Sequence, residues 1–119
     1  MSRRILIPLA VAAGALGVFD ARAFQGRYEV LGANIDGSLY RGQARIEITP
    51  GNGCRIVWNA GEASEGVCMR NANSFSVAYT VRGKIGIATY HIMQDGSMQG
   101  LFTFADTQGV GRETLVPVR

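Results

Sequence analysis

The sequence predicts an all-β protein: an eight-stranded antiparallel up-and-down meander closed into a small barrel, after a cleaved N-terminal signal peptide. From residue 24 onward polar and apolar side chains alternate with a period of two, turn signals recur about every 8 to 12 residues, and no run has helical spacing. Of the 119 residues, 47% are hydrophobic and 18% are charged, which suits one small globular domain and excludes a disordered chain.

The first 23 residues have the three zones of a secretory signal peptide. Arg3 and Arg4 supply its charge, residues 5–19 form an apolar run, and cleavage is expected after Ala23. The run is shorter than the ~20 residues that a membrane-spanning helix needs. We therefore expect a periplasmic or secreted protein without stable membrane insertion, whose single barrel domain covers residues 24–119. The two arginines leave both the general secretory and the twin-arginine route open.

The first four strands are expected at 26–35, 38–49, 53–60 and 63–71. Turn signals separate them at Asp36-Gly37, at residues 50–53 and at Ala60-Gly61. The second strand alternates most clearly, with one small or apolar face and one polar face. The first face consists of Tyr40, Gly42, Ala44, Ile46 and Ile48, and the second of Arg41, Gln43, Arg45 and Glu47.

The last four strands are expected at 73–81, 84–94, 97–105 and 110–117, with turn signals at residues 71–73, Gly83, Asp95-Gly96 and Gln108-Gly109. Short links make successive strands antiparallel neighbours, and closure into a barrel removes the two exposed edges of the sheet. A weak repeat, Asp-Gly-Ser at 36–38 and again at 95–97, indicates two hairpins with the same turn rather than duplicated binding loops.

Aromatic side chains dominate the expected interior. Besides the inner face of the second strand, the alternation turns inward Tyr28, Val30, Ile56, Trp58, Phe75, Val77, Tyr79, Phe102 and Phe104. Glycines opposite the large rings would make room for them; these are Gly32, Gly42, Gly66 and Gly100. An eight-stranded barrel is just wide enough to be filled by side chains or to hold one small ligand. With so many rings on short strands, we expect a filled interior.

The two cysteines are expected to form a disulfide bond. When the third hairpin is centred on Gly61, paired positions sum to 122, so Trp58 faces Ser64 and Cys54 faces Cys68. Closing a loop of this size stabilises a small exported domain by about 3 kcal/mol. The wide spacing differs from the Cys-x-x-Cys motif of redox-active pairs, so we expect a structural role.

The sequence offers little for catalysis. His91 is the only histidine, both cysteines are paired, and no serine lies in a Gly-x-Ser-x-Gly turn. We therefore predict no catalytic residue, no metal site and no cofactor. Three of the 12 basic and one of the 9 acidic residues precede residue 24, which leaves 9 basic and 8 acidic side chains and a net charge of +1. Such a charge gives no field that would attract nucleic acid.

The face on which His91 lies depends on the register across Asp95-Gly96. A two-residue loop pairs His91 with Gly100 and turns the histidine inward, whereas a loop one residue longer pairs Tyr90 with Phe102 and turns it outward. We favour the longer loop, because Tyr90 then belongs to a small and aromatic inner face like that of the second strand. The outer surface then carries an apolar stripe, which is either a partner surface or ordinary surface apolarity: Ile85, Ile87, Met93 and Leu101.

Glu113 is expected to face the interior, because it alternates with Leu115 and Pro117. A buried carboxylate needs hydrogen-bond partners. Two roles remain open, ligand recognition and a structural latch between the last and first strands, and we favour the latch.

Several short motifs resemble those of a family of small secreted bacterial β proteins, some of which carry a fibronectin-binding label. They are Gly26, Tyr28, Asp36-Gly37-Ser38, Tyr40 and Gly42, followed by Trp58, Tyr90, Asp95-Gly96, Gly100 and Gly111-x-Glu113. The architecture is also similar to that of avidin and lipocalin barrels, although the chain lacks the polar ligand set of the former and the N-terminal Gly-x-Trp of the latter. The resemblance implies a fold, and no catalytic residue follows from it.

Two functions are compatible with these features. The first is an exported, non-catalytic interaction module of the cell envelope, adhesin-like or inhibitor-like, which binds an unknown envelope or extracellular protein through its loops or the apolar stripe. The alternative is a carrier of a small apolar ligand inside the barrel, with Trp58, Tyr79, Tyr90 and Glu113 at the binding site. An enzyme is the least expected.

Overall fold

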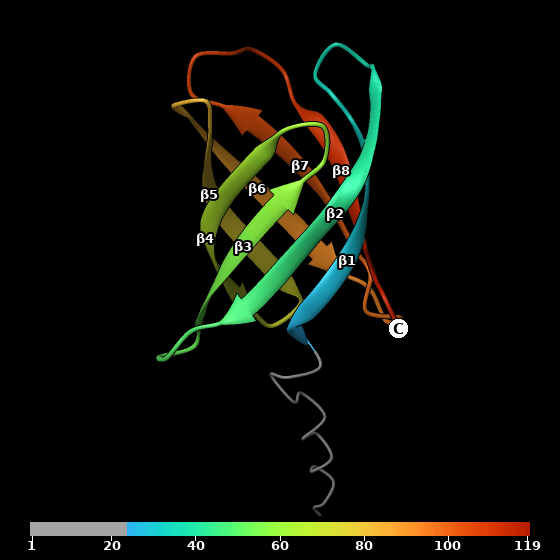
Figure 1. Cartoon of the computed structure of the whole chain (residues 1–119), viewed down its shortest axis with the longest axis vertical. Coiled ribbons are helices and arrows are strands. Elements are labelled where there is room, and N and C mark those ends of the chain that lie inside the picture. The colour runs from blue at the N-terminus through green and yellow to red at the C-terminus, as the bar shows by residue number, and fades with distance from the viewer. Residues whose placement is uncertain (1–23) are drawn as a thin grey trace, which may run out of the picture.

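The computed structural model describes residues 24–119, which form a closed antiparallel barrel of eight strands (Figure 1). Each strand pairs with the next, and the first closes on the last. The strands are β1 (Gly26–Ala33), β2 (Leu39–Ile48), β3 (Gly53–Asn59), β4 (Ala63–Asn71), β5 (Ser74–Val81), β6 (Lys84–Ile92), β7 (Met98–Phe104) and β8 (Gly111–Pro117). The predicted fold class is confirmed, and every strand begins and ends within two residues of its expected bounds.

The predicted signal peptide, with cleavage after Ala23, lies outside the described residues. Within residues 24–119, no helix has the length and hydropathy that crossing a bilayer requires.

The β3–β4 hairpin has the predicted register. Trp58 pairs with Ser64 and Cys54 with Cys68, as expected for a hairpin centred on Gly61. The Cα atoms of the two cysteines are 4.9 Å apart, and their sulfur atoms are bonded. The predicted disulfide is therefore confirmed, and it joins two neighbouring strands.

The two Asp-Gly-Ser segments form the same turn. In each, one aspartate oxygen accepts hydrogen bonds from the serine N–H at 2.9 Å and from the serine hydroxyl at 2.6 Å. The glycines, Gly37 and Gly96, have φ values of 91° and 90°. This left-handed conformation is typical of the last position in a three-residue hairpin loop. The repeat is a repeated turn, as the sequence indicated.

The register of β6 and β7 differs from the one we favoured. His91 is exposed, as predicted, but Tyr90 pairs with Gly100 and not with Phe102. The reason is the loop, which covers residues 94–96 so that Gly96 takes the left-handed position. This register places the Tyr90 ring over Gly100, where any larger residue would collide with the ring.

One end of the barrel is filled and closed. Its interior contains aliphatic and aromatic side chains with almost no exposed surface, namely Val30, Ile46, Ile56, Phe75, Met98 and Leu115. Phe24 covers this end just before β1, with its ring centroid 5.1 Å from that of Phe75. The Phe24 carbonyl accepts a hydrogen bond of 2.6 Å from the Tyr28 hydroxyl, and the Arg70 guanidinium lies 5.5 Å from the Phe24 ring.

Candidate functional site

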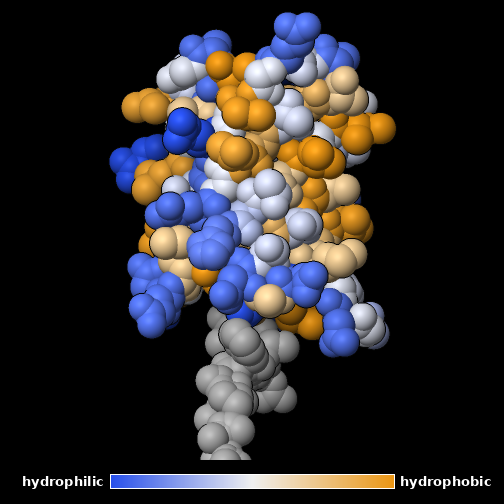
Figure 2. Space-filling model, turned by 180° about the vertical axis from the view of Figure 1, so that it is seen from behind, coloured by the Kyte–Doolittle hydropathy of each residue, from blue (hydrophilic) through white to orange (hydrophobic). Residues whose placement is uncertain are grey.

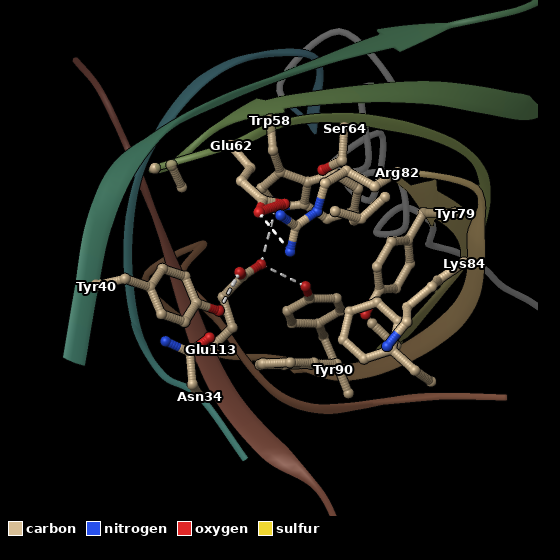
Figure 3. Close-up of a pocket in the computed structure, with 16 residues that line it drawn as sticks. Asn34, Tyr40, Trp58, Glu62, Ser64, Tyr79, Arg82, Lys84, Tyr90 and Glu113 are labelled. Carbon is tan, nitrogen blue, oxygen red and sulfur yellow. Dashed lines mark hydrogen bonds and ion pairs between the residues drawn. The ribbon is translucent and has the colours of Figure 1, made fainter. Parts of the chain in front are cut away.

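The opposite end of the barrel contains an open cavity of about 430 Å³ (Figure 3). A filled interior was expected, and this is correct only for the closed end. The reason is the position of the rings. Those of Tyr40, Tyr79 and Tyr90 lie over glycines of neighbouring strands, in space that other side chains would take. The rings therefore lie against the wall and leave the axis of the barrel open.

The predicted role of the glycines is confirmed at two positions and wrong at two. Gly32 and Gly100 lie against the rings of Tyr40 and Tyr90, whereas Gly66 lies against the Ala78 carbonyl and the Tyr79 Cα and Cβ atoms. Gly42 instead lies against the backbone of Asn59 and Ala60. Its lack of a side chain therefore permits close approach of β2 to the β3–β4 turn.

Six aromatic side chains line the cavity: Tyr40, Trp58, Tyr79, Tyr90, Phe102 and Phe104. Several of them contact one another edge to face or at a tilt. The Tyr79 ring centroid is 5.3 Å from that of Trp58 and 5.7 Å from that of Phe104. Such packed rings form a largely apolar wall of the cavity.

Glu113 is a buried carboxylate at the centre of this site, with only 7% of its surface exposed. Its Oε1 accepts a hydrogen bond of 2.7 Å from the Tyr40 hydroxyl. Its Oε2 accepts one of 2.9 Å from Trp58 Nε1 and one of 2.6 Å from the Tyr90 hydroxyl (Figure 3). The donors come from β2, β3 and β6, so the side chain ties β8 to these strands across the barrel. The expected latch to β1 is therefore wrong; β1 contributes only Gly32 opposite Glu113.

The environment of Glu113 keeps the hydroxyls of the surrounding tyrosines neutral. Burial raises the pKa of the Tyr40, Tyr79 and Tyr90 hydroxyls above the ordinary value, and the negative charge of Glu113 raises it further. Both causes disfavour a second negative charge in the cavity.

The Tyr79 hydroxyl has no hydrogen-bond partner among residues 24–119. Only 8% of this residue is exposed, and it lines the cavity. A molecule in the cavity could supply the missing bond.

Charged side chains at the rim are paired with one another. Arg82 Nη2 lies 3.0 Å from Glu62 Oε2 and links the β5–β6 and β3–β4 turns. Lys84 Nζ lies 3.9 Å from Asp106 Oδ1. In the part of the chain that the structure describes, no three His, Cys, Asp or Glu side chains gather in a way that could hold a metal ion.

The structure brings together the four residues predicted for a ligand site, since Trp58, Tyr79, Tyr90 and Glu113 all line the cavity. Sequence reasoning placed Tyr40 inside the barrel but missed it as a partner of Glu113. The rim residues were missed as well, because the sequence of a turn does not show which other turns lie beside it.

The outer surface carries charges unevenly. The outward side chains of β1 to β3 include many charges, whereas Glu65 is the one charged residue among those of β4 to β7. Figure 2 shows hydrophobic side chains gathered in the centre and toward the right edge of the rear face. A groove of about 660 Å³ runs there along β5, between side chains of β4 on one side and of β6 and β7 on the other.

The predicted apolar stripe lies partly in this groove. Ile87 and Leu101 are exposed and line it. Ile85 is exposed beside the groove, and Met93 lies in the β6–β7 turn. The opposite wall, formed by Val67 and Met69, was missed because their position relative to β6 depends on how β5 pairs on both sides.

The chain matches no protein-family model, and no curated protein is significantly similar to it. Solved structures share its fold. A redesigned β-barrel, mFAP1, bound to DFHBI superposes with a TM-score of 0.70 at 16% identity, over 82% of this chain and 97% of that chain. Apo lipid binding protein 8 from Caenorhabditis elegans has a TM-score of 0.52 at 9% identity, over 82% of this chain and 96% of that chain. At these identities the likeness shows an eight-stranded antiparallel barrel and nothing finer.

Proposed function

We propose that the protein is a non-catalytic binding barrel that takes a small, largely aromatic or apolar ligand in its open end. The observation that carries this proposal is the cavity of about 430 Å³ with a buried, hydrogen-bonded Glu113 among aromatic walls. Small-molecule sites are typically concave and mostly apolar, with a few polar groups that fix the orientation of the ligand, and their volumes are about 300–1,000 Å³. The dye-bound designed barrel supports the proposal as an example of a ligand held by this fold.

A pair of substitutions tests this function. Ala88 lines the inner cavity, so Ala88→Leu should fill part of it and weaken binding of a neutral aromatic probe, phenethyl alcohol. Ala78 is exposed on the outer face of the adjacent strand and provides the control Ala78→Leu. Isothermal titration of both folded variants should show weaker binding only for Ala88→Leu. Equal affinity in both variants, or no binding by the unaltered protein, would refute the proposal.

A second candidate function is the interaction module, and the uncharged groove along β5 favours it. Its occupant would be an apolar segment of another envelope or extracellular protein, in an adhesin-like or inhibitor-like role. Large exposed apolar patches are uncommon on monomeric proteins that bind nothing there. Under this function, Ile87→Asp should abolish association with the partner and leave probe binding in the cavity unchanged.

Export to the periplasm or beyond is part of the proposal. Its support is the signal-like N-terminus together with the Cys54–Cys68 bond, since disulfides persist in oxidising compartments. We also propose membership of the small secreted bacterial family whose motifs the sequence resembles. Intact-mass analysis of the exported protein tests the first point: a chain beginning at Phe24 is expected, and a mass that includes residues 1–23 would contradict it.

A further inference from the structure

Two acidic and two basic side chains line the cavity, but neither basic one is paired with Glu113. Four charged side chains line it: Glu62, Arg82, Lys84 and Glu113. Arg82 is paired with Glu62, and Lys84 with Asp106. Within residues 24–119 no basic side chain lies within ion-pair distance of Glu113. The negative charge of this buried group therefore has only neutral hydrogen-bond donors around it.

Glu113 retains room for one more donor. Two donors reach Oε2, whereas Oε1 accepts a hydrogen bond only from Tyr40. A carboxylate offers about two acceptor positions on each oxygen, so one position on Oε1 is free. All three present partners donate to it, which is the bonding pattern of an ionised carboxylate. Among residues 24–119 nothing occupies the fourth position.

The walls around this anion suit a positive charge. Aromatic faces attract cations because of the negative potential above the ring, and the attraction is stronger where water is excluded. Six rings line the cavity, and three of them belong to the partners of Glu113. The Tyr79 hydroxyl, which has no partner among residues 24–119, adds a possible acceptor for a second N–H of the same ligand.

We infer that the ligand is an organic cation: an ammonium group that donates a hydrogen bond to Glu113 Oε1 and is carried on a small aromatic or apolar body that fills the cavity. This inference rests on the proposed function and specifies its ligand class. It predicts the opposite preference from that of a fatty-acid carrier, because a ligand carboxylate would be repelled by the unpaired charge of Glu113.

Three probes of similar shape and different charge test the inference on the full mature protein. They are phenethylamine, which is cationic at neutral pH, phenethyl alcohol, which is neutral, and hydrocinnamate, which is anionic. Isothermal titration should show phenethylamine binding at least about tenfold more tightly than either of the others, as expected for a charge-assisted bond in a buried site. An alcohol or carboxylate that binds as tightly as the amine would overturn the inference and leave the proposed function standing. Failure of all three probes to bind would refute the proposed function itself.

Two variants with the same change in net charge show where the preference arises. In Glu113→Gln, the preference for the amine over the alcohol should fall to about threefold or less. Glu65→Gln removes an exposed carboxylate on the outer face, beside Arg55, and should keep the full preference. An equal loss in both variants would assign the preference to the overall charge and overturn the inference. If Glu113→Gln does not fold, the ranking of the three probes on the unaltered protein decides the question.

Discussion

Raising the pH above 10.0, the ordinary pKa of a tyrosine hydroxyl, should unfold this barrel. All four tyrosines of the chain have a raised pKa in the folded protein. Burial is the main cause at each, and the charge of Glu113 adds to it at Tyr40, Tyr79 and Tyr90. The unfolded chain ionises these hydroxyls at a pH where the folded chain does not. Their contribution to stability is therefore complete below pH 10 and is lost as the pH rises toward the folded-state pKa values.

The expected loss of stability is large. One pH unit above the ordinary pKa, ionisation of Tyr40, Tyr79 and Tyr90 stabilises the unfolded state by about 1.4 kcal/mol each, or about 4 kcal/mol together. Two units above it, the total is about 8 kcal/mol, which is comparable with the whole stability of a typical domain, about 5–15 kcal/mol. Lys84 is the only lysine and both cysteines are bonded, so few other groups titrate in this range.

Tyrosinate absorbance and far-ultraviolet circular dichroism, followed together against pH, measure this effect. The Tyr40, Tyr79 and Tyr90 hydroxyls should ionise in one cooperative step that coincides with loss of the β-sheet signal. Glu113→Gln should keep the cooperative step, because burial rather than charge is the main cause of the raised pKa. Two or more tyrosines that titrate near pH 10 while the sheet signal is unchanged would refute the reasoning.

Three further changes test the fold. Cys54→Ser should lower the free energy of unfolding by about 3 kcal/mol in oxidising buffer, as measured by urea denaturation. In reductant the variant and the unaltered protein should be equally stable. Equal stability of the two proteins in oxidising buffer as well would contradict a structural disulfide. Gly100→Ala should lower the free energy of unfolding by about 1–3 kcal/mol, because the added methyl group collides with the Tyr90 ring. A melting temperature equal to that of the unaltered protein would exclude the collision. Phe24→Ala should lower the free energy of unfolding by about 3 kcal/mol or more, because it removes the ring that covers the closed end. A smaller loss in urea denaturation would show that this ring is not needed for stability.

Much of the fold could be predicted from the sequence, because short hairpins are determined by local chemistry. The register of β3 and β4 followed from one turn at Gly61, and that register placed Cys54 opposite Cys68. Alternation gave the correct inner face for every strand, including the outward position of His91. The predicted β6–β7 pairing was wrong by two residues, because it placed Gly96 in the middle of a three-residue loop whose last residue is Gly96. The left-handed last position of such loops favours glycine, and this preference indicates the correct position of the loop.

The site was predictable as a set of residues but not as an arrangement. Alternation shows that Glu113 and Trp58 point inward, yet their contact depends on the stagger of strands around the closed barrel, which no single hairpin determines. The open cavity could not be predicted from single hairpins either. Ring positions over Gly32 and Gly86 decide whether the axis is filled, and those positions follow from the cross-strand register of several pairs.

Under the proposed function, the ligand accounts for the buried carboxylate better than the fold does. Burying an ion costs several kcal/mol, and apolar replacements of buried ionic groups are often neutral or stabilising. The closed end of the same barrel is filled by aliphatic and aromatic side chains without any charge. At the open end, donors from three strands surround Glu113, and about 430 Å³ is left open beside it. Charge and open volume each lower the stability of the empty protein. A cationic ligand that fills the cavity would offset both costs at once, which a purely structural role for Glu113 would not.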